Sequence, residues 1–406
     1  MIAPTLALRN VWKNRRRSCA TLLAIAVGHA AVNLFAGYIF NTYAALRDSA
    51  IYGEGLGHLT IARRGYFEQG SLKPEHYLFS EAELRRMSEV LATSIAPRVV
   101  SPRLSASGLV SNGKLSTIFI AEGEAPELAN RLWRRGAGRP KLDPDKPAAG
   151  LVSKGLAERL GAAAGGSVVV LANTMAGQIN ALDLEVLRVW DTGNAATNDK
   201  SLRLPLAFVR QLLDTDGASR ICVLLDEGAD ADAARARLQP VLAAAGFDVD
   251  IKTWIELSSF YRQVRNLFDL IFAFLSAIVL VVVLMGIVNT QSMSVMERVR
   301  EIGTLRALGM RRAAVVRLFA AEGALLGIVG SALGAVMTVL AVLAIRVGHI
   351  RYTPPSSSAS VPLSVSLLPD RLIETAVLLC LVATLAACWP ARRAARMEIV
   401  DALGHV

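Results

Sequence analysis

Four long apolar stretches in this sequence restrict the folds that the chain can adopt. Residues 18–43, 270–290 and 323–345 contain no Asp, Glu, Lys or Arg, and residues 372–391 contain a single charge, Glu374. A helix of about 20 apolar residues crosses the ~30 Å hydrocarbon core of a bilayer. The whole chain is 53% hydrophobic and only 19% charged, which is unusual for a soluble protein. The sequence therefore predicts a membrane protein with four transmembrane α-helices.

The region between the first two apolar stretches has the pattern of a folded α+β domain. Residues 57–64, 167–173, 219–227 and 247–253 predict strands, and residues 105–123 predict a hairpin that turns at Asn112-Gly113. The periodicity of residues 80–92, 153–161 and 230–246 predicts helices, the second of which is ended by Gly161. We expect two α+β lobes, one of them built from both ends of the region. Residues 254–270 predict a helical stalk that runs into the second span.

Positive charge beside the apolar stretches predicts the orientation of the chain, because loops rich in Lys and Arg stay in the cytoplasm. Three basic segments flank the spans, whereas residues 348–370 are nearly uncharged. The basic residues are Arg9, Lys13, Arg15, Arg16 and Arg17, then Arg298, Arg300, Arg306, Arg311, Arg312 and Arg317, and finally Arg392, Arg393 and Arg396. Both termini are therefore expected in the cytoplasm and the large domain outside.

These patterns together divide the chain into nine segments. A cleaved signal peptide is the alternative for the first span, but its apolar run is longer than that of a typical signal peptide, which favours a retained anchor. The segments are a cytoplasmic amphipathic helix (1–17), the first span (18–43), the extracytoplasmic two-lobed domain with helical stalks (44–266), the second span (267–290), a cytoplasmic helix with its lead-in (291–317), the third span (318–346), a short outer loop (347–370), the fourth span (371–391) and a cytoplasmic tail (392–406).

Several classes of function lack support in the sequence. The stretch GLVSNGKL at 108–115 resembles a phosphate-binding loop, but Leu115 stands where a Ser or Thr would reach Mg²⁺, and a hairpin explains the glycines. No nucleophile elbow or HExxH metal motif occurs, and His58 and His76 are expected at the surface. The net charge of +10 is concentrated beside the spans without a basic–aromatic stripe, which argues against nucleic-acid binding. We therefore expect no cofactor, metal or catalytic group in this chain.

Two features of the third span suggest how it packs. Gly323, Gly327, Gly330 and Gly334 are spaced as two small-xxx-small pairs, which allow helices to approach closely in lipid. These glycines predict a helix-packing face, with a partner in the same chain or in another. Glu322 lies at one end of this span, where we expect its carboxylate to reach the membrane interface.

The charged stretch ERVREIGTLRALGMRR at 297–312 lies between the second and third spans. On a helix, Val299, Ile302, Leu305 and Leu308 recur every three residues and form a narrow apolar stripe. Gly309 suits the left-handed residue that ends a helix. The segment is therefore predicted to be a compact cytoplasmic helix held between two membrane helices, the alternative being an interfacial turn with solvated arginines.

The residues of this segment resemble a known family. MERVREIGTLRALGMRRAAVVRLFAAEGALLGIVGSALG at 296–334 resembles the most recognisable stretch of the FtsX/MacB family of ABC transporter permeases, the type VII group. PARRAARMEIVDAL at 390–403 is similar to the closing motif of the family, although Ile399 stands where proline is usual. Residues 7–28 and 151–171 resemble its first span and a helix-then-strand segment of its outer domain. The resemblance covers the chain in order.

This resemblance implies a non-catalytic subunit of the bacterial inner membrane, with the large domain in the periplasm. In the family, the short cytoplasmic helix docks into an ATP-hydrolysing subunit, which binds ATP and Mg. The implied ATPase-coupling residues are Glu297, Arg300, Glu301, Gly303, Arg306 and Gly309. Since the chain starts about eighteen residues before its first span, the resemblance implies a separate ATPase dimer and a second permease copy or paralogue.

Within the family, the length and the two-lobed outer region resemble lipoprotein-releasing permeases of the LolC and LolE kind, or MacB-type exporters. This branch implies extrusion of a lipoprotein, lipid or other amphiphile, in contact with membrane lipid and with a periplasmic adaptor or lipoprotein. The alternative is signalling of the FtsX kind, in which ATP-driven motion activates a cell-wall hydrolase and nothing is transported.

Overall fold

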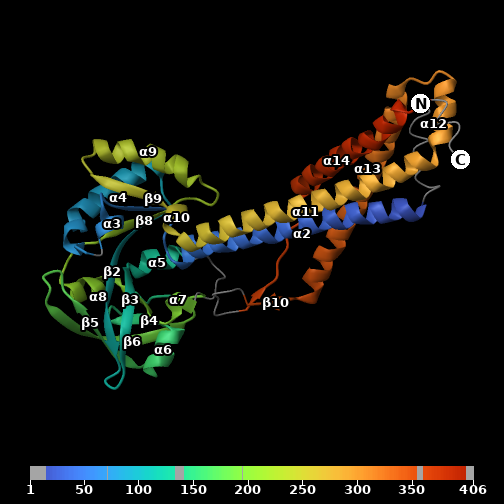
Figure 1. The fold of residues 1–406 in the computed structure, drawn as a ribbon. Helices are drawn as coiled ribbons and strands as arrows, with labels where there is room; N and C mark the ends of the chain where they lie inside the picture. Colours follow the sequence, from blue (N-terminus) through green and yellow to red (C-terminus); the bar gives the residue numbers. More distant parts are fainter. Residues whose placement is uncertain (1–14, 71, 133–140, 194, 354–359, 399–406) are drawn as a thin grey trace. The chain divides into compact units, whose positions relative to one another are not determined.

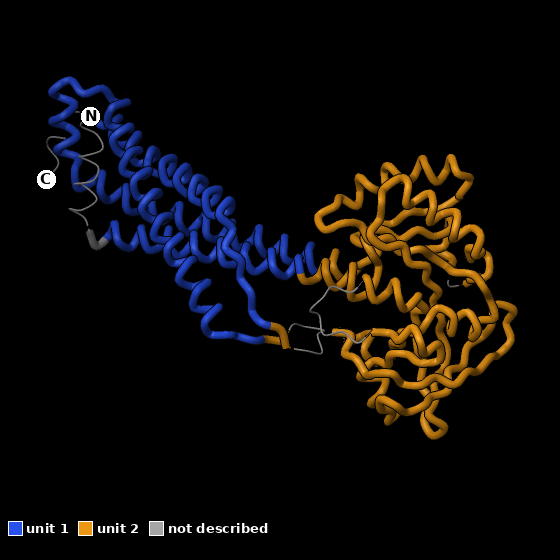
Figure 2. Tube along the Cα trace, turned by 180° about the vertical axis from the view of Figure 1, so that it is seen from behind, with its two compact units in different colours: residues 1–44, 264–351, 362–406 blue, residues 45–263, 352–361 orange. Residues whose placement is uncertain are grey.

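The computed structural model describes residues 15–70, 72–132, 141–193, 195–353 and 360–398. Most of the predicted N-terminal helix (1–17) and the end of the predicted tail therefore lie outside the described residues. The chain divides into two compact units (Figure 2). We call residues 1–44, 264–351 and 362–406 the bundle, and residues 45–263 with 352–361 the sheet domain.

Four helices among the described residues are long and apolar enough to cross a membrane. They begin or end in the bundle, where they run alongside one another (Figure 1). A shorter helix, α12, lies between the second and third of them, and two short strands precede the fourth. The bounds are α2 (Arg15–Asp48), α11 (Ser259–Glu297), α12 (Val299–Ala307), α13 (Arg312–Gly348), β10 (Arg351–Tyr352), β11 (Val361–Pro362) and α14 (Pro369–Arg396).

Side chains from all four long helices meet in the core of the bundle. The fully or nearly buried residues of this core are Ile25 of α2, Val283 and Ile287 of α11, Leu326 of α13, and Leu379, Ala383 and Ala386 of α14. Polar and aromatic contacts also join α2 to α11: Thr21 and Thr290 share a hydrogen bond of 2.6 Å, and Phe35 stacks on Phe272. The second helix pair, α13 and α14, is also in extensive contact.

The described strands of the sheet domain form one nine-stranded sheet in the order β3-β7-β4-β6-β5-β2-β8-β1-β9, with a further pairing of β2 and β3. That pairing closes β2, β3, β7, β4, β6 and β5 into a barrel. The strands are β1 (Leu59–Arg63), β2 (Val99–Ser111), β3 (Ser116–Glu124), β4 (Ala149–Ser153), β5 (Ser167–Asn173), β6 (Ile179–Trp190), β7 (Ser201–Pro205), β8 (Arg220–Leu224) and β9 (Val249–Thr253).

Strand β2 belongs to both parts of this sheet. Its first residues, 99–103, pair with β8, whereas residues 108–111 pair with β5 in the barrel. Strands β8, β1 and β9 come from the two ends of the region, as the sequence predicts for one lobe. The two lobes are nevertheless joined by a continuous hydrogen-bonded sheet, because β2 is long enough to pass from one to the other.

Helices cover each part of the sheet (Figure 1). Helix α8 contacts five barrel strands and contributes Leu206, Phe208, Val209, Leu212 and Leu213 to the barrel core. Helix α4 starts with a capping box between Ser80 and Glu83 and packs against α9, which contacts β9. The helices are η1 (Ser49–Gly53), α3 (Tyr66–Gln69), η2 (Pro74–Tyr77), α4 (Glu81–Ile95), α5 (Pro126–Leu132), α6 (Lys154–Leu160), α7 (Ala195–Asn198), α8 (Leu206–Leu213), α9 (Ala231–Ala244) and α10 (Trp254–Leu257).

Local predictions for this domain are mostly confirmed, with two corrections. The β2–β3 hairpin turns through Asn112 and Gly113, and Gly161 ends α6 with a φ of +60°. The predicted stalk is not one continuous helix, because Ser258 leaves the helical conformation between α10 and α11. The surface position predicted for His58 is wrong: its side chain is buried, and its Nδ1 accepts a hydrogen bond from the Leu225 N–H at 3.1 Å.

Candidate functional site

The predicted coupling segment forms a short helix whose two ends are fixed by its own backbone. Helix α12 follows a single non-helical residue, Arg298, and its last turn closes in a Schellman motif. In this motif the Gly309 N–H donates to the Arg306 carbonyl and the Met310 N–H donates to the Leu305 carbonyl, each at 3.0 Å. Gly309 adopts a φ of +94°, which L-residues rarely adopt. The sequence therefore sets the length of α12.

One side of α12 packs onto the ends of three long helices. Val299, Ile302 and Gly303 are buried on this side. Ile302 joins an apolar cluster with Val295 of α11, Val315 and Phe319 of α13, and Ala391, Ala394 and Ala395 of α14. Displacement of α12 therefore disturbs the ends of α11, α13 and α14 together.

Three polar contacts attach the segment to its surroundings. Arg298 donates to Glu322 of α13 at 3.0 Å, and both side chains are nearly buried. Arg306 donates to the Met397 carbonyl, just after α14. Glu297, the last residue of α11, accepts from Arg17 of α2 at 2.5 Å. Glu322 is thus buried and paired inside the bundle, whereas we expected its carboxylate to extend to an exposed position.

The opposite side of α12 is exposed and combines charge with apolar surface. Arg300 and Glu301 are exposed, and so are Leu305 and Leu308, whose side chains are 36% and 81% exposed. The predicted apolar stripe is therefore buried only in its first half, because the closing turn carries Leu308 away from the bundle. An exposed apolar side chain bordered by charged ones has the general anatomy of a docking surface, which has an apolar centre and a polar rim.

The four glycines of the third span lie where α13 comes closest to two other helices. A Cβ atom on Gly323 would lie 2.6 Å from the Ala383 carbonyl oxygen of α14, and one on Gly327 would lie 2.9 Å from the Cys380 Cα. A Cβ on Gly330 would lie 2.7 Å from the Ile25 Cβ of α2, and one on Gly334 would lie 2.7 Å from the Ala26 carbonyl oxygen. The packing partners of these glycines are helices of the same chain.

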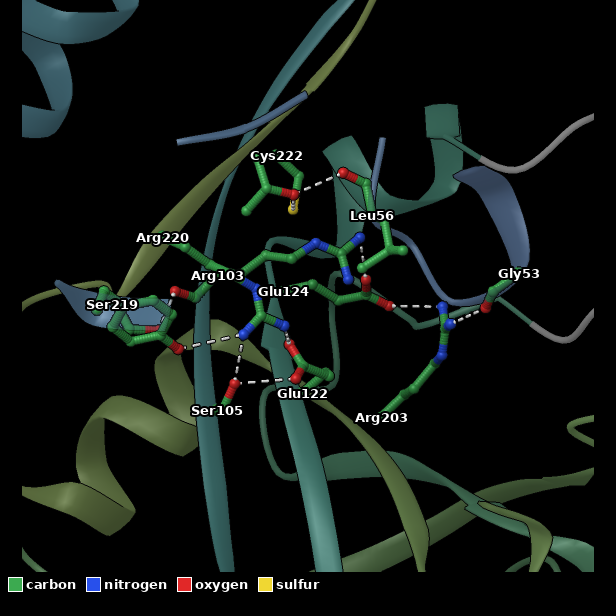
Figure 3. A network of polar contacts seen from close by, with 12 residues as sticks. Gly53, Leu56, Arg103, Ser105, Glu122, Glu124, Arg203, Ser219, Arg220 and Cys222 are labelled. Carbon is green, nitrogen blue, oxygen red and sulfur yellow. Dashed lines mark hydrogen bonds and ion pairs between the residues drawn. The ribbon is translucent and has the colours of Figure 1, made fainter. Parts of the chain in front are cut away.

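The sheet domain holds a cluster of charged side chains that sequence reasoning missed (Figure 3). Arg103 of β2 and Glu124 of β3 form an ion pair of 2.9 Å with both side chains fully buried. Glu124 also pairs with Arg203 of β7 at 3.4 Å. Beside them, Glu122 pairs with Arg220 of β8 at 2.5 Å. The cluster gathers where β2 leaves the barrel for the outer strands.

The electrostatics of this cluster favour the charged forms of Glu122 and Arg103. Burial opposes ionisation of Glu122, but Arg220 and Arg103, with hydrogen bonds from Arg220 and Ser105, hold its carboxyl pKa below the ordinary value. Burial likewise acts to lower the pKa of Arg103, but the adjacent Glu124 outweighs it and the pKa is raised. The sequence gives one weak signal, since Arg103, Glu122 and Glu124 interrupt strands that are otherwise apolar or small.

Comparison with protein families assigns most of the chain. Residues 18–241 match the MacB-like periplasmic core domain family, and residues 273–399 match the FtsX-like permease C-terminal family. The first match alone spans more than half of the chain. This chain belongs to the MacB/FtsX family of ABC transporter permeases. The resemblance read from residues 296–334 and 390–403 is thereby confirmed, and so is the fold of four membrane helices with a large α+β domain.

Individual relatives agree with this assignment. The permease is 30% identical over 226 residues to the macrolide export ATP-binding/permease protein MacB of Escherichia coli (strain K12), covering 54% of this chain and 31% of the relative. It is also 30% identical over 135 residues to the ABC transporter permease YtrF of Bacillus subtilis, covering 32% and 31%. The aligned part thus spans about a third of the length of each of these relatives.

Two solved structures resemble this permease weakly. The periplasmic region of MacB from Actinobacillus actinomycetemcomitans matches with a TM-score of 0.37 and 15% identity, covering 52% of this chain and 95% of that one. The extracellular domain of the noncanonic ABC-type transporter YknZ from Gram-positive bacteria matches with a TM-score of 0.34 and 16% identity, covering 48% and 98%.

Proposed function

We propose that this permease couples ATP hydrolysis by a separate ATPase subunit to movement of its large domain, and that α12 is the element to which the ATPase binds. The observation that supports α12 is the contrast between its two sides. The buried side contacts the ends of α11, α13 and α14, whereas the exposed side presents Arg300, Glu301 and Leu308. A partner bound to the exposed side would move three membrane helices through a single contact.

The proposal includes a location. We place the permease in the bacterial inner membrane with both ends in the cytoplasm, because the basic segments flank the spans on one side. Helix α12 then lies in the cytoplasm, where ATP is available, and the sheet domain lies in the periplasm. The MacB-like periplasmic core domain match of residues 18–241 supports this orientation.

The proposal also includes partners. ATP and Mg are bound by a dimer of ATPase subunits, and each ATPase subunit requires one α12. A second permease copy or a related permease is therefore needed to complete the assembly. Relatives named as ATP-binding/permease proteins support the association of this permease type with an ATPase.

For the cargo, we propose a lipoprotein, lipid or other amphiphile that is extruded from the outer leaflet or the periplasm. The similarity of 54% of this chain to a protein named for macrolide export supports transport. FtsX-like signalling to a cell-wall hydrolase is the second candidate, and the match of residues 273–399 to the FtsX-like permease C-terminal family supports it. What the sheet domain binds distinguishes the two candidates.

The test is purification of the tagged permease from its native membrane in mild detergent, with mass spectrometry of the retained proteins and lipids. We expect an ATPase subunit together with a lipoprotein or lipid. A cell-wall hydrolase in place of the amphiphile would favour signalling. Recovery of the intact permease without any ATPase, in detergent that preserves known assemblies of this type, would contradict the proposal.

Substitution of the exposed leucine makes the test specific for α12. Leu308→Asp places a charge at the centre of the proposed docking surface, and hot-spot losses of 2 kcal/mol or more weaken binding by on the order of 30-fold. Leu72→Asp is the matched control, because Leu72 is 79% exposed in the sheet domain and Leu308 is 81% exposed. We expect Leu308→Asp to lose the ATPase subunit and Leu72→Asp to retain it.

A further inference from the structure

The segment that follows the first membrane helix is bonded to one arginine of the barrel (Figure 3) and lies against a second. Residues 49–58 connect the end of α2 to the start of β1. Arg203 of β7 donates through Nη2 to the Gly53 carbonyl. Gly55, with a φ of +72°, lies so close to Arg103 that a Cβ there would be 2.6 Å from Nη1 and 2.7 Å from Nη2. The backbone of this segment therefore rests directly on both guanidinium groups.

These contacts do not follow from the order of the strands. Residues 49–58 lead into β1, which pairs with β8 and β9 outside the barrel. The two arginines come from β2 and β7, and Glu124 of β3, which lies between them, pairs with each. The barrel thus holds a stretch of chain that is not one of its own strands and that continues directly from a membrane helix.

Charge makes this attachment more specific in position than apolar packing would be. A buried ion pair contributes little net stability, but removal of one member leaves an uncompensated buried charge, so the groups are held in one arrangement. Glu124 is fully buried and the Arg203 side chain is only 10% exposed. A displacement of residues 49–58 that keeps the hydrogen bond between Gly53 and Arg203 therefore also moves Arg203, and it presses Gly55 against Arg103 or withdraws it.

We propose that Arg203 and Arg103, held in place by Glu124, transmit displacement of the first membrane helix directly to the barrel. The two arginines are positioning residues in this account, and Gly55 allows the close approach. The inference rests on the proposed function, because it names the route by which movement started at α12 enters the large domain. It also makes a claim about residues 49–58 that is independent of any ATPase.

The independent claim is tested by hydrogen–deuterium exchange of the full-length permease in lipid nanodiscs. The amides of Glu54, Leu56 and Gly57 bond to carbonyls of residues 49–51. We expect Arg203→Gln to increase their exchange by about tenfold or more. Arg220→Gln is the matched control, since this arginine is also nearly buried but bonds Glu122, Ser105 and Tyr66 instead. We call the contacts of Arg203 and Arg103 with residues 53–55 the clamp. If both variants accelerated the exchange of these amides equally, the clamp would be overturned.

The transmission claim is tested in the complex with the ATPase subunit, by comparing the nucleotide-free and vanadate-trapped states. We expect the wild type to change its exchange at α12 and in β3 and β7. Arg203→Gln should keep the response at α12 and lose it in β3 and β7, whereas Arg220→Gln should keep both. Arg203→Lys retains the charge but not the two separate nitrogens that reach Glu124 and Gly53, so it should lose part of the response.

The outcomes separate the two proposals. If the exchange of β3 and β7 still changed between the nucleotide states in Arg203→Gln, the transmission route would be overturned and the proposed function would remain. The same conclusion would follow if the wild type changed its exchange at α12 but not in these strands. A wild type that binds the ATPase but shows no response at α12 would contradict the proposed function. The exchange of residues 54–57 in the permease alone would still decide whether the clamp exists.

Discussion

The bundle and the sheet domain both contain buried arginine–glutamate pairs, but the two regions use them differently. In the bundle, glycines bring helix backbones together, and the Arg298–Glu322 pair adds one buried ionic contact where α12 meets α13. In the sheet domain, an apolar barrel core provides the packing, and three arginines with two glutamates form a connected cluster beside it.

The difference follows from the surroundings of each region. Lipid gives no hydrophobic driving force for association between helices, so close packing of small residues holds the bundle together. A domain in water gains stability from apolar burial, whereas a buried ion pair contributes little net stability, so we infer that the buried charges of the sheet domain fix its geometry. In each region the buried charges lie beside a segment that our proposals assign to the transmission of movement. This segment is α12 in the bundle and residues 49–58 in the sheet domain.

The largest effect is expected when the buried Arg298–Glu322 ion pair of the bundle is broken. Glu322→Gln leaves Arg298 buried beside a neutral group, and removal of one partner of a buried pair typically costs about 3–5 kcal/mol. We expect α12 to detach, so that amide exchange in residues 299–307 accelerates by at least a hundredfold. Glu301→Gln is the control, because this carboxylate is exposed on the same helix. The double variant Arg298→Glu, Glu322→Arg should restore part of the protection.

The next effect concerns close packing in the bundle. Gly330→Ala places a methyl group 2.7 Å from the Ile25 Cβ, and overpacking of this kind costs about 1–3 kcal/mol. Gly286→Ala in α11 is the matched control, since a Cβ there meets nothing within 4 Å and alanine is the better helix former. Thermal unfolding in mild detergent should separate the two variants. Equal stabilities would show that glycine spacing does not hold the bundle together.

A smaller effect is expected at the turn that closes α12. Gly309→Ala forces an L-residue to a φ of +94°, at a cost of about 1–2 kcal/mol. We expect faster exchange of the Met310 amide and weaker binding of the ATPase subunit, by on the order of tenfold. Gly348→Ala provides the control at the other end of α13, where the added Cβ makes only ordinary contacts. An unchanged affinity would show that the geometry of the turn is unimportant for docking.

The smallest effect is a pH dependence that belongs to the sheet domain. Burial, and then the charge of Arg47, lower the pKa of His58 below its ordinary value of 6.5. His58 therefore binds a proton more readily in the unfolded chain than in the folded one. Its contribution to the free energy of unfolding is complete above about pH 6.5 and is lost as the pH falls below this value, by at most about 1.4 kcal/mol per pH unit. Denaturant unfolding at pH 7.5, 6.5 and 5.5 measures this loss.

Variants at the two histidines of this domain assign the effect. His58→Gln keeps an acceptor for the Leu225 N–H but removes the titration, so the dependence on pH in this window should largely disappear. His76→Gln should retain it, because the His76 side chain is 67% exposed. If both variants kept the same dependence, a group other than His58 would be responsible.

Much of this architecture could be predicted because its signals are local in sequence. Long apolar runs identify membrane helices, a short valine-rich run identifies strand β5, and glycine marks the ends of α6 and α12. The charged motif between two spans likewise predicts the short helix α12. These signals depend only on neighbouring residues, so they can be recognised without knowledge of the tertiary fold.

The features that escaped prediction depend on contacts between distant residues. Arg103 and Arg203 are one hundred positions apart, and strand pairing alone brings them to Glu124. His58 looked like a loop residue because the strand that buries it, β8, lies more than 160 residues later. Periodicity places Leu308 on the apolar side of α12, but it does not show that the closing turn carries this side chain away from the bundle.

The most direct test of the central claim is photocrosslinking from position 308 in native membranes. A photoreactive amino acid replaces Leu308 in one sample and Leu72 in another, and the products are identified by mass spectrometry. The account predicts a crosslink between position 308 and an ATPase subunit, with none to that subunit from position 72. A permease that assembles normally but crosslinks at position 308 only to lipid would contradict the assignment of α12 as the ATPase-binding element.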